Sequence, residues 1–164
     1  GHVNASPEKE FVEALTLITS GTLIPKNAFI DVGLMRESLF IDQIDIEWCH
    51  RARAKGYKLF GTYGGRMHQH MGESVLHVWF MRWRKESLYS PLRIYYRIRN
   101  FVFLLGLDYI DLRWKIRSGW YWLGIVYAHA IFGPQKIKSL LMLARGLRDG
   151  LRGKAGKYNQ RDSN

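Results

Sequence analysis

The stretch from Leu39 to Ala52 constrains the fold most, because it joins an apolar run, three carboxylates and a helical repeat within fourteen residues. Ile44, Trp48 and Ala52 recur at i, i+4 and i+8, a spacing that places them on one face of an α-helix. Gly56 follows as a residue suited to the position just after a helix end. The sequence therefore predicts a helix over residues 44–55.

Three carboxylates lie at the predicted start of this helix: Asp42, Asp45 and Glu47. Unpaired backbone N–H groups and the helix dipole favour negative charge there, and an aspartate in that place could accept a proton in catalysis. The same pattern also fits a structural role, in which Asp42 or Asp45 caps the helix and Glu47 pairs with Arg51 one turn later. The local pattern leaves both interpretations open.

Residues 39–52 resemble the acceptor-side motif of family 2 (GT-A type) glycosyltransferases, in the form F-I-D-x-x-D-x-E-W-C that is typical of the bacterial rhamnosyltransferase branch. Further segments match that family in the same order: Thr19–Ile24 (which resembles its T-S-G-x-L-I strand and is called the T-S-G motif below), His70–Ser74, Ser90–Arg93, Arg99-Asn100 and Arg145–Leu151. The resemblance covers residues 15–155, nearly the whole chain. It implies a mixed α/β fold class, the C-terminal half of a GT-A-like nucleotide-sugar transferase followed by an α-helical, basic and aromatic region.

This resemblance and the composition predict four segments: 1–14 as tag remnant (Gly1-His2) and lead-in, 15–88 as the acceptor-side half of the catalytic domain, 89–155 as a helical, membrane-peripheral region, and 156–164 as a disordered tail. Within them, Leu15–Ile24 is rich in β-forming residues and predicts a buried strand that is interrupted at Ser20-Gly21. The alternating pattern of residues 57–63 predicts another strand, and residues 66–70 form a second strand-like run. Pro25 and Ser90-Pro91 predict helix starts, and Pro134 predicts the start of the last helix.

The resemblance implies a role for each candidate site residue. Asp45 matches the catalytic aspartate, which would deprotonate the acceptor hydroxyl. Acceptor contacts are expected from the following residues: Asp42, Glu47, Trp48, Ser20, Gly21, Glu73 and Ser74. His70 matches a histidine near the donor diphosphate and its divalent ion, so it is the candidate metal ligand, and a structural histidine fits the pattern equally. Ser20-Gly21 also fits a simple turn or bulge.

The donor-binding half of the resembled enzymes has no counterpart in this sequence. Those enzymes begin with a βαβ unit ending in an Asp-x-Asp that holds Mg²⁺ or Mn²⁺ under the sugar diphosphate, and here Asp108-x-x-Asp111 has the wrong spacing and place. We therefore expect the C-terminal portion of an inverting glycosyltransferase that is inactive alone. The resemblance implies a nucleotide-sugar donor such as dTDP-rhamnose. The implied acceptor is a hydroxyl of a bacterial surface polysaccharide or lipid-linked glycan.

Positive charge is concentrated in the second half of the chain. Residues 1–88 carry 11 Lys/Arg and 10 Asp/Glu, whereas residues 89–164 carry 14 and 4. Gly119–Gly133 is uncharged and flanked by basic residues, but it is shorter than the roughly 20 residues that a membrane-spanning helix needs. It fits either a helix lying on an anionic membrane surface or an ordinary core helix. The expected location is cytoplasmic, peripheral on the inner face of the cell membrane.

The same charge also fits a different class, a non-enzymatic basic module that binds anionic membrane or nucleic acid. Because no zinc finger, helix-turn-helix or RNP-type aromatic motif accompanies the charge, we do not expect nucleic acid as a partner. Cys49 is the only cysteine, which excludes an internal disulfide, and its place beside Trp48 predicts a buried, inert thiol. The sequence leaves the oligomeric state open.

Overall fold

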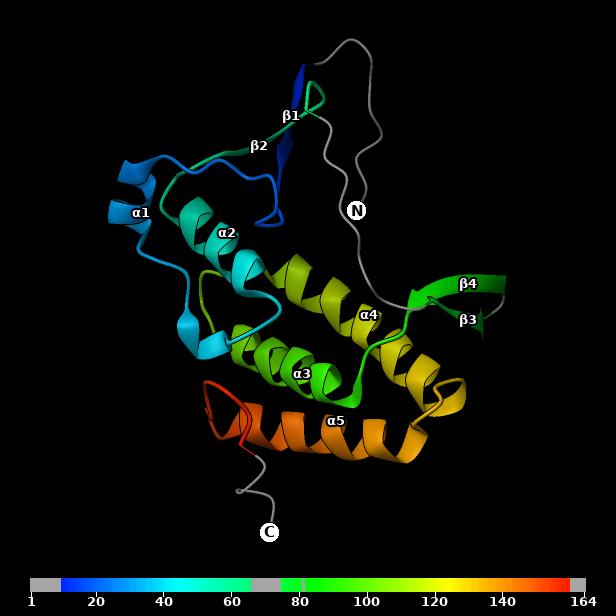
Figure 1. Ribbon diagram of the computed structural model, residues 1–164. Coiled ribbons are helices and arrows are strands. Elements are labelled where there is room, and N and C mark those ends of the chain that lie inside the picture. Colours follow the sequence, from blue (N-terminus) through cyan, green and yellow to red (C-terminus); the bar gives the residue numbers. More distant parts are fainter. Residues whose placement is uncertain (1–9, 66–74, 81, 160–164) are drawn as a thin grey trace. The chain divides into compact units, whose positions relative to one another are not determined.

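A computed structural model describes residues 10–65, 75–80 and 82–159 (Figure 1). Helices dominate, and the described strands form two separate two-stranded antiparallel sheets, so the predicted mixed class holds in its coarse form. Contacts divide the chain into two compact units. Of the described residues, one unit contains 10–35 and 45–65, and the other contains 36–44, 75–80 and 82–159.

The first unit is built from two strands and two helices: β1 (Phe11–Ala14), α1 (Lys26–Val32), α2 (Ile44–Ala54) and β2 (Leu59–Thr62). β1 and β2 pair antiparallel, with Phe11 opposite Thr62. α2 packs Trp48 and Ala52 against Ala28 and Val32 of α1. Trp48 and Ala52, two of the three residues predicted to share a helix face, are therefore confirmed as buried, whereas Ile44 is half-buried. Gly56, with φ of 89°, follows the helix end as predicted.

The strand predicted over Leu15–Ile24 is wrong. β1 ends at Ala14, and the chain continues as a loop that turns where the N–H of Thr22 donates to the carbonyl oxygen of Thr19 (3.1 Å). Gly21 has φ of 76° in this turn, a left-handed conformation that cannot continue an extended strand. The β-forming residues on either side therefore belong to a loop, which we call the 17–25 loop.

The second unit is built on three helices, a hairpin and a short 3₁₀ turn: α3 (Pro91–Leu105), α4 (Leu112–Ile131), α5 (Lys136–Leu151), β3 (Val75–Phe80), β4 (Arg82–Ser87) and the turn Glu37–Leu39. The predicted start of α3 is confirmed, because Ser90 Oγ accepts from the N–H of Arg93 and Pro91 is the first helical residue. Ile98 and Phe101 of α3 form a core with Trp122 and Ile125 of α4.

α3 and α5 lie side by side (Figure 1) and approach closely because α5 places two glycines on the shared seam. A Cβ on Gly146 would lie 2.6 Å from the carbonyl oxygen of Tyr95, and a Cβ on Gly150 would lie 2.8 Å from Cβ of Val102. Contacts between carbon atoms normally begin near 3.5 Å, so only glycine fits at either position without movement of the helices.

A buried polar pair crosses the same seam. The hydroxyl of Tyr95, a fully buried residue, donates to Oδ2 of Asp149 (2.9 Å), and Oδ1 of Asp149 accepts from Nε of Arg148 (3.1 Å). Burial, together with the bond to the Asp149 carboxylate, raises the pKa of Tyr95 to about 12. Burial works against ionisation of Asp149, but the hydrogen bonds from Tyr95 and Arg148 outweigh it, so the net pKa of Asp149 is lowered.

The segment after α5 folds back onto α3. The N–H of Tyr158 donates to the hydroxyl of Tyr96 (2.6 Å), and its ring centroid lies 4.7 Å from that of Tyr95. Residues 156–159 are therefore held in the structure, although the sequence predicted a disordered tail from residue 156. The predicted functional boundary between residues 88 and 89 stays a prediction.

Candidate functional site

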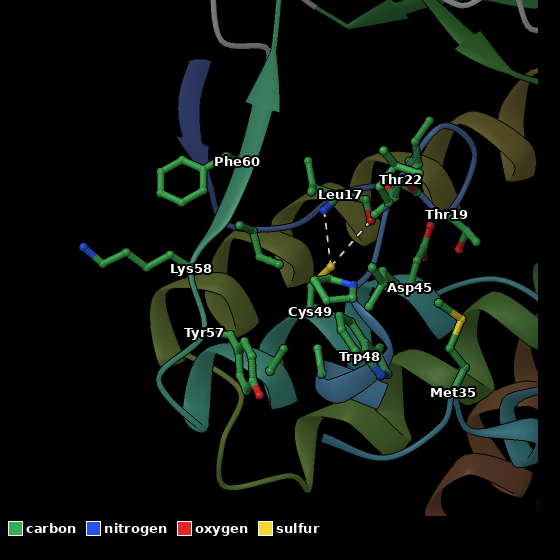
Figure 2. A pocket seen from close by; sticks show the side chains of 17 residues that line it. Leu17, Thr19, Thr22, Met35, Asp45, Trp48, Cys49, Tyr57, Lys58 and Phe60 are labelled. Carbon is green, nitrogen blue, oxygen red and sulfur yellow. Dashed lines mark hydrogen bonds between the residues drawn. The ribbon is translucent and has the colours of Figure 1, made fainter. Parts of the chain in front are cut away.

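A pocket of about 240 Å³ lies in the first unit between α2, the 17–25 loop and the start of β2 (Figure 2). Its walls are mainly apolar and include Leu17, Ile24 and Phe60. Asp45 and Trp48, two of the predicted site residues, line it. The pocket is therefore the place in the first unit where the acid-bearing helix meets the segment that resembles the family's T-S-G motif.

Asp45 lies in the first turn of α2 and is half-buried. Its Oδ1 accepts from the N–H of Ile46 (2.9 Å), the next residue of the helix. Figure 2 shows its side chain on the side of the pocket where Thr19 and Thr22 lie. Among the described residues that line the pocket, Asp45 is the one with a carboxylate. A hydroxyl that enters the pocket would therefore find one candidate base, flanked by apolar walls and two threonine hydroxyls.

Trp48 and Cys49 close the floor of the pocket with polar atoms that are already bonded. Trp48 Nε1 donates to the carbonyl oxygen of Gly33 (2.8 Å), so its ring, and not its N–H group, is available to a ligand. Cys49 Sγ accepts from the N–H of Leu17 (3.3 Å) and donates to the carbonyl oxygen of Leu17 (3.6 Å). Burial raises the pKa of the Cys49 thiol, and a protonated, enclosed thiol is a poor nucleophile. The thiol is buried, as the sequence predicted.

Glu47 is fully buried and faces a partner within the first unit. Its Oε1 and Oε2 accept from Nε and Nη2 of Arg51 at 3.0 and 3.1 Å. Arg51 also donates to the carbonyl oxygens of Val32 (2.7 Å) and Leu34 (2.8 Å), so the pair ties α2 to the end of α1. Glu47 therefore has the structural role that the sequence left open, pairing with Arg51 one helical turn later. Its acceptor contact stays a prediction that this geometry does not favour, because both carboxylate oxygens already accept from Arg51.

Ser20 and Gly21 line a neighbouring hollow of about 400 Å³, together with Gly61 and Thr62 of β2. The two cavities share five lining residues: Leu17, Ile18, Thr22, Leu23 and Phe60. The first unit therefore brings four of the predicted site residues to two adjoining cavities: Asp45, Trp48, Ser20 and Gly21. That they bind an acceptor stays a prediction.

Asp42 belongs to the second unit, where its carboxylate pairs with α3. Oδ2 accepts from Nε of Arg93 (2.9 Å) and Oδ1 accepts from Nη2 of the same arginine (3.0 Å). This two-point pairing fixes both the position and the orientation of the carboxylate. Acceptor binding by Asp42 stays a prediction, and an acceptor hydroxyl would have to share oxygens that Arg93 already uses.

The backbone around Asp42 is strained and is held by Asn100. Three residues that are not glycine have φ of 62°, in the left-handed region: Phe40, Asp42 and Gln43. Nδ2 of the fully buried Asn100 donates to the carbonyl oxygens of Leu39 (3.0 Å), Ile41 (2.8 Å) and Asp42 (3.0 Å). Left-handed conformations of such residues cost of the order of 1–3 kcal/mol each, so they persist only where surrounding contacts impose them.

Arg99 completes this arrangement, which we call the α3 clamp (Arg93, Arg99 and Asn100). Its Nε donates to Oδ1 of Asn100 (3.0 Å), which orients the amide, and its Nη2 donates to the carbonyl oxygen of Leu39 (2.9 Å). Sequence reasoning noted Arg99-Asn100 as family-like but gave the two residues no role. One signal was available in the sequence: these two polar residues lie among the apolar residues of α3, where burial, and therefore hydrogen bonding, is expected.

Three of the predicted residues, His70, Glu73 and Ser74, lie outside the residues that the structure describes. Within residues 10–65, 75–80 and 82–159, no three His, Cys, Asp or Glu side chains form a group that could hold a metal ion. The divalent metal that is expected in the full-length enzyme, with His70 as its candidate ligand, stays a prediction.

Sequence reasoning missed four polar residues that line the pocket: Thr19, Thr22, Tyr57 and Lys58. Thr22 Oγ1 donates to the carbonyl oxygen of Ile18, and Lys58 extends away from Asp45 in Figure 2. The two threonines belong to the segment that resembles the T-S-G motif, and that membership was the signal that could have identified them.

Comparison with known proteins gives one informative relationship. The chain is 33% identical over 146 residues to dTDP-rhamnosyl transferase RfbF of Shigella flexneri. The match covers 87% of this chain and 48% of that protein, so the chain spans about half the length of the curated relative it matches. No family model and no solved structure matches the chain. The chain is therefore similar to part of a rhamnosyl transferase, which supports a glycosyltransferase-like function.

Proposed function

We propose that this chain forms the acceptor-side part of a glycosyltransferase that moves a rhamnosyl group from a dTDP-linked donor to a hydroxyl of a bacterial glycan. The observation that carries the proposal is the place of Asp45 in a mainly apolar pocket, beside the loop that resembles the family's T-S-G motif. Similarity to a dTDP-rhamnosyl transferase supports the donor class.

In this proposal Asp45 acts as the general base. A carboxylate oxygen of Asp45 accepts the proton of the acceptor hydroxyl while the oxygen of that hydroxyl forms a bond to the anomeric carbon of the donor sugar. The bond between the anomeric carbon and the diphosphate oxygen breaks, and the nucleoside diphosphate leaves with the electron pair. A single displacement of this kind inverts the anomeric configuration. The apolar walls exclude water, which would otherwise compete with the acceptor for the donor.

Residues around Asp45 supply contacts that suit a sugar. Hydroxyl groups of Thr19 and Ser20 can exchange hydrogen bonds with sugar hydroxyls, and Phe60, which is 49% exposed, can pack against an apolar sugar face. Gly21 leaves the backbone accessible beside them. Contacts from Glu73 and Ser74 remain part of the proposal, although both lie outside the described residues.

The test is the substitution Asp45→Asn in the full-length product of the gene. Removing a general base should lower kcat by about 10²–10⁴, with little change in acceptor KM and an unchanged circular dichroism spectrum. Asp108→Asn is the matched control, because Asp108 is an exposed carboxylate in the other unit. The readout is release of dTDP from dTDP-rhamnose in the presence of a glycan or lipid-linked acceptor.

Two outcomes would contradict the proposal. Near-normal turnover of Asp45→Asn, with activity abolished in a folded Glu47→Gln variant, would move the base to Glu47. Failure of the full-length protein to release dTDP with any acceptor, while it releases another nucleotide from another sugar donor, would reject the rhamnosyl donor but not the role of Asp45.

A further inference from the structure

α4 is apolar on two opposite faces, and only one of them is used in the core. Its inner face buries Trp122, Ile125 and Ala128 within the second unit. Its outer face carries large apolar side chains that are exposed: Leu112 (69%), Ile116 (56%), Trp120 (72%), Leu123 (62%) and Ile131 (47%). We call these five residues the α4 stripe.

The spacing of the α4 stripe places its members in one line. Steps of four, four, three and eight residues keep side chains on one side of a helix that has 3.6 residues per turn. The helix has 20 residues, so the stripe runs along about 30 Å. A line of large, exposed apolar side chains along one helix is typical of an interaction site rather than of ordinary exposed surface.

Charge identifies the partner that fits this face. From Leu112 to Arg148 the sequence has seven Lys and Arg residues and no Asp or Glu. Arg113 and Arg117 are exposed on α4, next to the stripe in helical projection. Lys115 has a structural role, because its Nζ donates to the carbonyl oxygens of Leu105 (2.8 Å) and Leu107 (2.9 Å) after α3. The partner must therefore be apolar and anionic at once.

The boundary between head groups and acyl chains of an anionic bilayer has this chemistry. Tryptophan favours that depth, and Trp120 is the most exposed member of the stripe. No helix in the described parts of the chain is long and apolar enough to cross a membrane. We infer that α4 lies along the surface of an anionic membrane, with the α4 stripe among the outer acyl segments and Arg113 and Arg117 at the phosphates.

Vesicle co-sedimentation tests this inference. The chain should bind vesicles that contain phosphatidylglycerol more tightly than vesicles of phosphatidylcholine alone, and high salt should weaken the binding. Ile116→Glu and Trp120→Glu should each weaken binding by about tenfold or more. Each substitution removes an apolar side chain that would be buried among the acyl chains, and it adds a negative charge that the anionic lipids repel. Arg113→Gln and Arg117→Gln should each weaken it by about fivefold, and only on anionic vesicles.

Ile30→Glu is the matched control, because Ile30 is 76% exposed on helix α1 and the substitution is the same as at position 116. It should leave vesicle binding unchanged, and circular dichroism should show that all variants fold. The inference is overturned if the wild-type chain does not bind anionic vesicles, or if Ile116→Glu binds as well as Ile30→Glu. It is also overturned if sedimentation velocity without lipid shows a dimer that Ile116→Glu dissociates, because the stripe would then bind a second copy of the chain.

Discussion

Asn100→Ala should be among the most destabilising single substitutions in the second unit. The change removes the amide that donates to the carbonyl oxygens of Leu39, Ile41 and Asp42, and it leaves Nε of Arg99 without its acceptor on Asn100. The left-handed residues that the amide supports would then have lost a principal restraint.

The expected cost follows from the hydrogen bonds. A net hydrogen bond contributes about 1 kcal/mol, and a buried carbonyl left without a donor costs about 1–3 kcal/mol. The carbonyl oxygen of Leu39 keeps Nη2 of Arg99 as a donor, so the carbonyls of Ile41 and Asp42 carry the loss, and together they predict a cost of about 2–5 kcal/mol. Asn100→Asp should cost at least as much, because it keeps the shape but turns a second oxygen toward three carbonyl oxygens. Asn27→Asp is the matched control, since Asn27 is exposed in the first turn of α1, where negative charge is favoured.

Guanidinium unfolding followed by far-ultraviolet circular dichroism measures these differences, provided that the slope with denaturant stays the same. The control should change the free energy of unfolding by less than about 0.5 kcal/mol. If Asn100→Ala costs less than about 1 kcal/mol, the reasoning is refuted, because a hydrogen-bonded amide that supports three carbonyls would then contribute no more than a single surface contact.

Two further predictions concern the seam between α3 and α5. Gly150→Ala should cost about 1–3 kcal/mol by overpacking, whereas Gly124→Ala on α4, where nothing lies within 4 Å of the new Cβ, should gain up to about 1 kcal/mol in thermal unfolding. Because the pKa of Tyr95 is raised from 10 to about 12, the folded state keeps a proton that the unfolded chain releases, so stability falls as the pH rises from about 10 to 12. The difference in unfolding free energy between wild type and Tyr95→Phe should be constant below pH 10 and shrink above it, and an unchanged difference at pH 12 would contradict the assigned role of the buried phenol.

Local signals were enough to predict most helices. The i, i+4 repeat at Ile44, Trp48 and Ala52 gave α2, and the Ser90-Pro91 pair gave the start of α3, because both act within one or two turns. The strand over Leu15–Ile24 failed because the β-forming residues on both sides of Ser20-Gly21 lie in a loop, whereas the alternative of a turn at Ser20-Gly21 agrees with the left-handed conformation of Gly21.

The site was predictable only where its residues are neighbours in sequence. The placement of Asp45 at a helix start and the pairing of Glu47 with Arg51 both follow from spacing along one helix. The partner of Asp42 does not, because Arg93 lies 51 residues further along the chain. An acidic cluster therefore looked like one functional group in the sequence, whereas in the structure its members have different partners.

The division of the chain has a consequence for any attempt to dissect it. Residues 36–44 belong to the second unit but interrupt the first, so neither unit is encoded by a continuous stretch. A fragment that begins after residue 70 would keep α3 but would lack the carbonyl groups of Leu39, Ile41 and Asp42, to which Arg99 and Asn100 donate. Such a fragment should stay incompletely ordered until a peptide spanning residues 36–44 is supplied in trans, and that peptide should bind through its backbone more than through its side chains.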